Sequence, residues 1–405
     1  MTRVPLPASL LQRLVRAVPQ ALTRKIKDLR RDLAVLTGAF SGNHPAPVIV
    51  RTRRTPRSSS LVATRHVRVK SVVHDTADAL CVELEDPTGA PFSFVPGQFF
   101  TVVLPLEGET LRRAYSASSA CQSPATVRIT VKRVAGGKVS NYIVDSLREG
   151  AFLELLGPSG NFVVAPNPGA QRSLVLIAGG SGITPMMSIL QSVLPVEPET
   201  QVTLLYGNRG EADIIFRKAL ADLAAGEPRF VLRHVLSNPP DGWNGAAGVL
   251  DEATTSRELA LLGNLPETTE YYVCGPQPMM DAARAALRSR GVDPEKIHEE
   301  RFSSPHLRPA AHKITTPQPL TVRCGARETI TTVGPDQTLL EAGLAAGAAM
   351  KFSCTLGGCA ACKVKVVSGE VAMEEPNCLS SDERNEGFVL ACVARANSPV
   401  VVEVL

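Results

Sequence analysis

Four cysteines near the C-terminus constrain the fold of this chain more than any other feature. Four, two and twenty-nine residues separate them in the order Cys354, Cys359, Cys362 and Cys392. Thiolates at this spacing hold a [2Fe-2S] cluster, whereas zinc sites built from thiolates use two close pairs. Gly357 and Gly358 let the loop bend around the iron and direct N–H groups at the sulfurs. The spacing therefore favours a cluster over zinc or free thiols.

The rest of the composition is that of a globular protein. The chain has 405 residues, of which 44% are hydrophobic and 20% charged, enough for roughly two to four domains. No apolar run approaches the roughly eighteen residues of a membrane-spanning helix. Nine cysteines, unevenly spread, indicate a reducing compartment, so we expect a cytoplasmic protein. Five cysteines outside the quartet are predicted to be small buried hydrophobes: Cys81, Cys121, Cys274, Cys324 and Cys378.

The N-terminal arm is strongly basic. Residues 1–70 carry a net charge of +13 and residues 71–405 a net charge of −9. Five apolar residues recur at helical spacing among Lys and Arg: Leu22, Ile26, Leu29, Leu33 and Leu36. This pattern predicts a basic amphipathic helix. Residues 38–60 are rich in Pro, Ser and Arg and predict a linker, which together with the helix forms a predicted segment 1–64.

Three hypotheses remain open for the arm. Residues 10–36 could contact an anionic membrane surface and place the protein at its periphery. They could instead belong to a targeting peptide, because residues 1–27 contain Arg and no acid. The third hypothesis is a helix packed on its own acidic body. Nucleic-acid binding is not expected, since the arm has one aromatic residue and no recognition motif.

The spacing of apolar residues differs between successive parts of the remaining chain. Residues 65–168 contain short β-branched runs broken by Gly and Pro, which predict a small antiparallel β-barrel. Residues 169–303 alternate apolar runs with helical stretches, among them 212–226 and 278–291, and predict a parallel sheet with helices on both faces. A proline-rich linker is predicted at 304–318. Strand-like runs open and close the last domain, 319–405.

The predicted barrel carries three short motifs: Arg113-Ala114-Tyr115-Ser116, GGKVS at 136–140 and GPSGNF at 157–162. In their order and spacing they resemble the flavin-binding barrel of the ferredoxin-NADP reductase superfamily. The resemblance implies that Arg113 pairs with the flavin pyrophosphate, Tyr115 stacks on the isoalloxazine and Ser116 bonds near its N5. The other implied flavin contacts are Ala114, Val131, Lys132, Gly137, Lys138, Val139 and Ser140. FAD is favoured over FMN, because GGKVS suits the larger pyrophosphate.

The α/β segment continues the resemblance. AGGSGITP at 178–185 follows an apolar run and opens a predicted helix, so its glycines would admit a pyrophosphate to the helix N-terminus, although it is not the GxGxxG fingerprint. The resemblance places Thr184 near flavin and nicotinamide, residues 206–209 beside the adenosine, and Glu300 and Phe302 over the flavin. Cys274 is either a nicotinamide contact or a core cysteine. The implied nucleotide or flavin contacts are Gly179, Gly180, Gly182, Thr184, Arg209, Cys274, Gly275, Pro276 and Phe302, and the implied catalytic residues are Tyr115, Ser116, Thr184 and Cys274.

Residues 318–405 resemble the plant-type ferredoxin domain, an α+β β-grasp fold, which implies Cys354, Cys359, Cys362 and Cys392 as cluster ligands. The order of the three domains resembles reductase components of multicomponent oxygenases, such as phthalate dioxygenase reductase and the phenylacetyl-CoA epoxidase reductase, and electron-transfer partners of membrane acyl desaturases.

The resemblance implies an enzyme that takes a hydride from NADH or NADPH to FAD and passes single electrons through the cluster. An oxygenase or a membrane fatty-acyl desaturase or hydroxylase would receive them. A redox-sensing protein without sustained turnover is the alternative. The nucleotide preference stays open: Asn238 follows Ser237 where relatives that use NADPH commonly have Arg, and Arg209, Arg217 or Lys218 could substitute.

Overall fold

The computed structural model describes residues 64–302 and 316–404, apart from Asp336, Ser353, Leu356, Cys359, Glu375, Pro376 and Ser380. The predicted basic helix, the linker that follows it, most of the predicted linker at 304–318 and the predicted ligand Cys359 lie outside the described residues. Three domains follow one another within the C-terminal unit, Leu61–Leu405.

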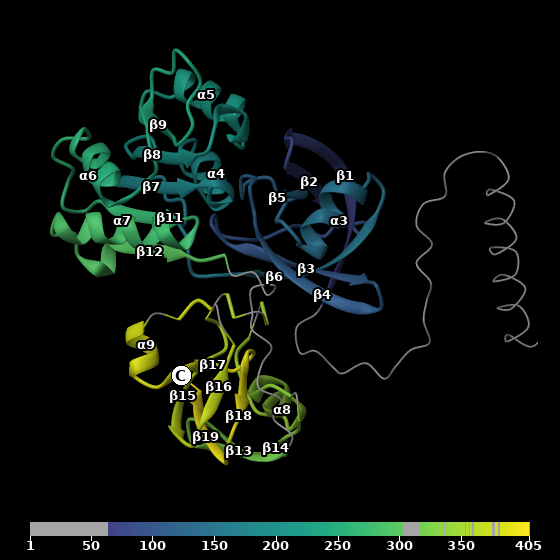
Figure 1. The fold of residues 1–405 in the computed structure, drawn as a ribbon. Helices are drawn as coiled ribbons and strands as arrows, with labels where there is room; N and C mark the ends of the chain where they lie inside the picture. The colour runs from purple at the N-terminus through teal and green to yellow at the C-terminus, as the bar shows by residue number, and fades with distance from the viewer. Residues whose placement is uncertain are drawn as a thin grey trace, which may run out of the picture. The chain divides into compact units, whose positions relative to one another are not determined.

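The first domain is built from six antiparallel strands and one helix (Figure 1). The elements are β1 (Arg65–Thr76), β2 (Ala79–Glu85), β3 (Phe99–Leu106), β4 (Glu109–Ser116), β5 (Thr126–Lys132), α3 (Lys138–Ser146) and β6 (Phe152–Ser159). The strand order is β4-β3-β6-β1-β2-β5. A bridge between Ala117 and Ile129 joins the two ends of this order, so the sheet closes into the predicted barrel.

The barrel core follows from alternation along the strands. Leu80, Val82 and Leu84 of β2 are buried together with every second residue of β5, because successive side chains of a strand point to opposite faces. Every strand of the barrel except β4 overlaps one of the predicted β-branched runs, which are residues 66–73, 79–86, 97–105, 126–134 and 151–158. The β4 sequence, ETLRRAYS, is poor in the β-branched residues from which the other strands were predicted.

The second domain contains a six-stranded parallel sheet of order β10-β9-β8-β7-β11-β12. Its strands are β7 (Ser173–Gly179), β8 (Gln201–Asn208), β9 (Phe230–Leu236), β10 (Ala246–Ala247), β11 (Glu270–Cys274) and β12 (Ile297–Glu300), and its helices are α4 (Ile183–Val193), α5 (Arg217–Gly226), α6 (Glu252–Ala260) and α7 (Gln277–Ser289). Leu174 and Leu176 pack with α4 and α5, whereas Val175 and Ile177 pack with α6 and α7. Helices on both faces were predicted and are confirmed.

One predicted helix begins later than expected. The stretch 212–226 was predicted to be helical throughout, but α5 starts only at Arg217. Glu211–Asp213 form a separate 3-10 turn, and Phe216 has a left-handed backbone with φ of 61°, which cannot continue a right-handed helix.

The barrel and the parallel sheet share a hydrophobic core. Ala79, Phe162 and Val164 of the first domain belong to the same buried cluster as the α4 and α5 face of the sheet. Hydrogen bonds join the two domains at this boundary: Asp75 Oδ2 accepts from the Phe216 N–H at 2.6 Å, and Ser192 Oγ accepts from the Cys121 N–H at 3.0 Å. The Phe216 N–H belongs to the N-cap of α5, so a carboxylate of the barrel caps a helix of the second domain.

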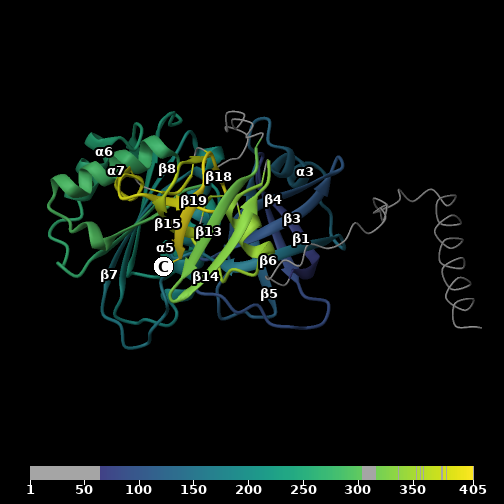
Figure 2. The same cartoon turned by 90° about the horizontal axis from the view of Figure 1, so that it is seen from below.

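The third domain has the α+β architecture that its resemblance to the plant-type ferredoxin domain implied (Figure 2). Its sheet has the order β14-β13-β19-β15-β17 and is accompanied by a two-stranded ribbon, β16-β18. The elements are β13 (Gln318–Cys324), β14 (Arg327–Val333), α8 (Leu339–Ala345), β15 (Lys363–Ser368), β16 (Val371–Met373), α9 (Ser381–Asn385), β17 (Phe388–Leu390), β18 (Ala394–Ala396) and β19 (Val400–Val404). The two predicted terminal strands, β13 and β19, pair in parallel at the sheet centre.

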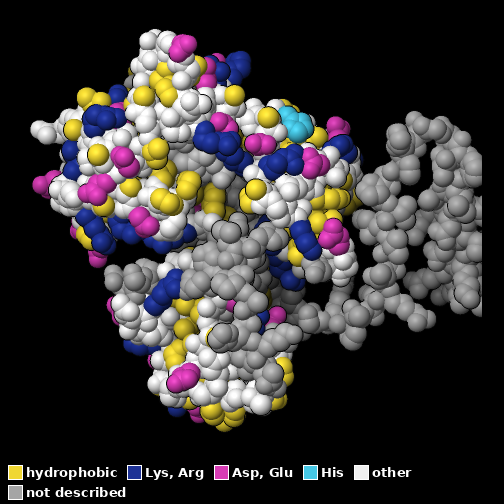
Figure 3. Space-filling view, viewed as in Figure 1, with side chains coloured by type: hydrophobic (Ala, Val, Ile, Leu, Met, Phe, Trp, Pro, Cys, Tyr) yellow, Lys and Arg dark blue, Asp and Glu magenta, His cyan; other side chains and the backbone are white. Residues whose placement is uncertain are grey.

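The surface carries both signs of charge. Figure 3 shows Lys and Arg interspersed with Asp and Glu over the described part of one face. None of the helices in the described part of the chain is long and apolar enough to cross a membrane.

We predict that Asp75→Ala lowers the free energy of unfolding by about 1 kcal/mol, because the N-terminus of α5 loses its acceptor. Asp75→Asn should retain most of the stability, since its side-chain oxygen accepts the same bond. Chemical denaturation of the purified protein measures both, with Asp78→Ala, in the same hairpin and paired with Arg133, as the control. An equal loss in the Asp75→Ala and Asp78→Ala variants would contradict the prediction.

Candidate active site

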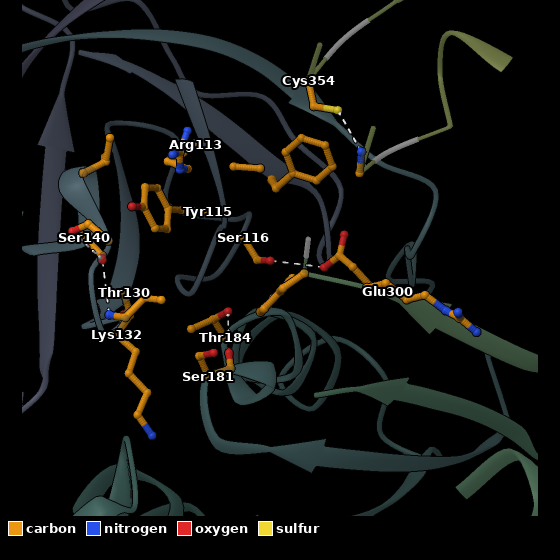
Figure 4. A pocket seen from close by; sticks show the side chains of 18 residues that line it. Arg113, Tyr115, Ser116, Thr130, Lys132, Ser140, Ser181, Thr184, Glu300 and Cys354 are labelled. Atoms are coloured by element: carbon orange, nitrogen blue, oxygen red, sulfur yellow. Dashed lines mark hydrogen bonds between the residues drawn. The ribbon is translucent and has the colours of Figure 1, made fainter. Parts of the chain in front are cut away.

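One cavity gathers most of the residues singled out in the barrel motifs. Figure 4 shows Arg113, Tyr115 and Ser116 of β4 facing it, with Thr130 and Lys132 of β5 beside them. Residues from the second domain complete the wall: Ser181, Thr184, Glu300, Arg301 and Phe302. The cavity is therefore formed where the barrel meets the carboxyl end of the parallel sheet, which is where such sheets bind ligands.

Ser116 and Glu300 form the polar centre of this wall. The Ser116 hydroxyl donates to Glu300 Oε2 at 3.1 Å, and both residues are buried. Burial raises the pKa of Glu300 to about 8, against an ordinary value of 4.5, since the charged form is deprived of water. Glu300 can therefore hold or release a proton near neutral pH at a position adjacent to Ser116.

Tyr115 and Arg113 flank this centre on the barrel side. Burial raises the pKa of Tyr115, so its phenol stays neutral and offers an aromatic face and a hydroxyl rather than a base. The Arg113 guanidinium donates to the Arg112 carbonyl at 2.6 Å and lines the cavity. A half-buried guanidinium of this kind suits a phosphate.

Two helices begin at the cavity. Helix α3 starts after Gly137, and the Ser140 hydroxyl accepts from the Val134 N–H at 3.2 Å, which fixes the turn. Helix α4 starts at Ile183, and the Thr184 hydroxyl donates to the Ser181 carbonyl at 3.0 Å. The positive dipole ends of both helices favour anions, so this wall fits the phosphates of a flavin or a dinucleotide.

The glycine turn, Gly179–Gly182, is packed directly against the end of β11. A Cβ added at Gly182 would lie 2.0 Å from the carbonyl oxygen of Cys274, and one at Gly275 would lie 3.0 Å from the Gly179 nitrogen. The contact arises because β7 and β11 are paired neighbours, with Ala178 opposite Cys274. Only glycine fits, and this close approach brings α4 and Glu300 to the same place.

Lys132 reaches from the barrel towards the glycine turn. A Cβ at Gly180 would lie 3.5 Å from its Nζ. Burial lowers the pKa of Lys132, and within the described residues its ammonium group makes no hydrogen bond or ion pair. An ammonium group in this position is available to an anion bound at the turn.

Several predicted contact residues do not line the cavity. Val131 points into the barrel core, because it alternates with Thr130 and Lys132 along β5. Lys138 is exposed and pairs with Glu107 at 3.3 Å, and Arg209 pairs with Asp213 at 2.6 Å at the end of β8. The other residues in this group are Gly179, Gly180, Gly182, Gly275 and Pro276, which form or support the glycine turn.

Cys274 is buried in the core of the second domain and is absent from the cavity wall. Burial raises the pKa of its thiol far above the usual value, so the group stays neutral there. The location fits a core cysteine, and the backbone of Cys274, not its sulfur, contacts the glycine turn.

The cavity wall also includes residues that the sequence analysis did not single out, among them Phe99, Thr130 and Ser181. Thr130 could have been found from strand alternation, since it shares a face with Lys132. Nothing local in the sequence distinguishes Phe99 from a core residue.

The described cysteines of the quartet are buried in the third domain. The Gly357 N–H donates to Cys392 Sγ at 3.3 Å and the Gly358 N–H donates to Cys354 Sγ at 3.4 Å. Cys362 belongs to the same buried cluster, and Cys359 is outside the described residues. Amide groups directed at sulfurs are what cluster thiolates require, so the loop fits a [2Fe-2S] cluster. Cys354 and Gly358 line the same cavity as Tyr115 and Ser116 (Figure 4).

Comparison with known proteins assigns the three domains. Family models match in succession: an oxidoreductase FAD-binding domain at residues 65–164, an oxidoreductase NAD-binding domain at 176–285 and a 2Fe-2S iron-sulfur cluster binding domain at 323–397. The chain is 37% identical to one of the subunits of 1,2-phenylacetyl-CoA epoxidase from Escherichia coli, over 83% of this chain and 96% of that protein. The chain belongs to the ferredoxin-NADP reductase superfamily.

Other members extend the likeness over all three domains. The reductase subunit of glycine betaine monooxygenase from Pseudomonas aeruginosa is 32% identical over 84% of this chain and 95% of its own. The solved structure of phthalate dioxygenase reductase is 26% identical, with a TM-score of 0.56, over 84% of this chain and 98% of its own. The protein is thus an oxidoreductase with FAD, a nicotinamide nucleotide and a [2Fe-2S] cluster as predicted.

The pKa of Glu300 predicts a pH-dependent stability. Between about pH 4.5 and 8 the folded carboxyl keeps a proton that the unfolded one has lost, so the free energy of unfolding falls as pH rises through this window. Glu300→Gln cannot ionise and should not lose stability in this window. The free energy of unfolding of Glu300→Gln, relative to that of the wild type, should therefore rise by up to a few kcal/mol from pH 5 to pH 8, since one pKa unit corresponds to about 1.4 kcal/mol.

Unfolding of the cofactor-free protein at both pH values measures the effect, with the exposed Glu107→Gln as a matched control. Parallel pH profiles for the wild type and Glu300→Gln would contradict the assigned shift.

Proposed function

We propose that this protein is the reductase component of an oxygenase system, which accepts two electrons from NAD(P)H and delivers them singly to a separate oxygenase. The observation that carries the proposal is the common cavity: Tyr115 and Ser116, Thr184 and the cluster-loop residues Cys354 and Gly358 line one space. Relatives named as reductase subunits or components of monooxygenases support it. They disfavour the alternative of a redox sensor without turnover.

The cofactors supply the electron chemistry: a bound flavin accepts a hydride and gives up electrons one at a time, and the cluster accepts single electrons. The protein positions them. We assign phosphate binding to Arg113, Lys132 and the N-termini of α3 and α4. Tyr115 offers its ring to the flavin, and Phe302 closes the cavity on the side of the second domain.

Ser116, Thr184 and Glu300 would govern the reacting end of the cavity. Ser116 donates to Glu300, whose raised pKa lets it hold a proton beside the reacting atoms at neutral pH. Thr184 stands at the first turn of α4, and its hydroxyl position is fixed by the Ser181 carbonyl. Cys354, Cys359, Cys362 and Cys392 would hold the cluster. In this proposal the domains span residues 65–168, 169–303 and 319–405, with the arm at 1–64 and a linker at 304–318.

The finer proposal concerns the partner. The +13 charge of residues 1–70 and the amphipathic pattern within residues 10–36 support docking on an anionic membrane beside a membrane-bound acceptor, such as a fatty-acyl desaturase or hydroxylase.

We predict that Cys392→Ser removes the iron–sulfur absorption and most of the NAD(P)H-dependent reduction of cytochrome c, a one-electron acceptor, because a ligand is lost. Reduction of the flavin by NAD(P)H should persist. Cys378→Ser is the matched control, since Cys378 is half-buried beside the cluster loop but lies outside the quartet. Undiminished cytochrome c reduction by the Cys392→Ser protein would contradict the proposed electron route.

The membrane proposal predicts that the full chain floats with vesicles containing anionic lipid and that residues 65–405 alone do not. The truncated protein should still reduce cytochrome c at the wild-type rate, since the arm contributes no cavity residue among those described. Neutral vesicles provide the control, because electrostatic attraction requires anionic headgroups. Equal flotation of both proteins would exclude the arm as the anchor.

A further inference from the structure

The ends of β8 and β9 form one continuous edge next to the glycine turn. The Ser237 N–H donates to the Asn208 carbonyl at 3.0 Å, and the Asn238 N–H donates to the Arg209 carbonyl at 2.7 Å. Strand β8 is the direct neighbour of β7, which leads into the turn. A dinucleotide whose pyrophosphate lies at the turn therefore extends its adenosine ribose along the carboxyl ends of β8 and β9.

The three cations that the sequence analysis offered as substitutes at this edge are each paired with a carboxylate. Arg209 contacts Asp213 at 2.6 Å, Arg217 contacts Glu211, and Lys218 contacts Asp222. These six charges cancel. A 2′-phosphate, which distinguishes NADPH from NADH, carries about two negative charges at neutral pH and would find no unpaired cation among them.

The acids at this edge are held more firmly than the cations. Asp213 Oδ2 also accepts from the Gly210 N–H at 3.1 Å and closes the 3-10 turn Glu211–Asp213, and its side chain is 25% exposed. The Arg209 side chain is 70% exposed. Because exposed ion pairs interact weakly, a phosphate could draw the arginine away, but the carboxylate would remain and repel it. A ribose hydroxyl, by contrast, donates readily to a fixed carboxylate.

From this arrangement we infer that the electron donor is NADH and that Glu211 and Asp213 set the preference. Asn238, exposed beside Ser237, adds a neutral amide where a cation would favour the phosphate. The inference rests on the proposed function, in which a nicotinamide nucleotide reduces the flavin, and it specifies which nucleotide.

The first test compares kcat/KM for NADH and NADPH in the full-length holoenzyme with cytochrome c as the acceptor. We expect NADH to be favoured by about tenfold or more, because the preference comes from exposed charges. Calorimetric dissociation constants for NAD⁺ and NADP⁺ give a readout independent of turnover and should show the same order.

The second test changes one acid. Glu211→Gln frees Arg217 and removes a negative charge, so the ratio of kcat/KM for NADPH to kcat/KM for NADH should rise about five- to tenfold. Glu328→Gln is the matched control: it breaks the exposed pair with Arg323 in the third domain, away from this edge, and it should leave the ratio of the two nucleotides unchanged.

Equal or better use of NADPH by the wild type would overturn the inference. An unchanged ratio in Glu211→Gln, or an equal change in Glu328→Gln, would also overturn it. Failure of both nucleotides to reduce the flavin would contradict the proposed function instead, and the dissociation constants of NAD⁺ and NADP⁺ would still decide the preference.

Discussion

The contact of Gly182 with the Cys274 carbonyl is the constraint on which the site depends. Two neighbouring parallel strands, β7 and β11, end in turns that approach each other so closely that only glycine fits between them. Strand β12, paired with the other side of β11, then ends at Glu300. The N-terminus of α4 and a buried carboxyl are thus delivered to the same cavity by sheet geometry, and Ser116 of the barrel meets that carboxyl from the opposite wall.

The charges around the cavity differ between the part of the wall that would bind phosphates and the part that contains Ser116 and Glu300. Positive groups, comprising Arg113, Lys132 and two helix N-termini, lie where phosphates would bind. The one acidic side chain named in the wall, Glu300, is buried deeply enough to stay mostly protonated at neutral pH. Tyr115 is neutral for the same reason. Besides Arg301, whose guanidinium pairs with Glu299, the described wall around Ser116 and Glu300 carries little fixed charge, and Glu300 is free to exchange a proton there.

The sequence was informative where chemistry demands fixed residues in short motifs. The cysteine spacing, the RAYS tetrapeptide and the glycine turn each fall at the cavity or the cluster loop, because backbone bending and phosphate contact restrict the residue types. It was less informative about side-chain direction. Val131 was predicted to contact the flavin together with Lys132, yet strand alternation directs its side chain into the barrel core. Cys274 was implied as a nicotinamide contact, but its side chain is buried in the core and does not line the cavity. The start of α5 was misplaced, because the left-handed Phe216 is stabilised by Asp75 of another domain, a contact with no local signal.

The shared core of the first two domains has a consequence for recombining this protein. Ala79, Phe162 and Val164 are buried among residues of the parallel sheet. Separating the first domain from the second between β6 and β7 would therefore expose a hydrophobic surface on each domain. The buried cluster of the third domain, by contrast, draws only on its own residues. A chimera should therefore be joined between β12 and β13, so that the flavin-binding and nucleotide-binding domains are transferred together.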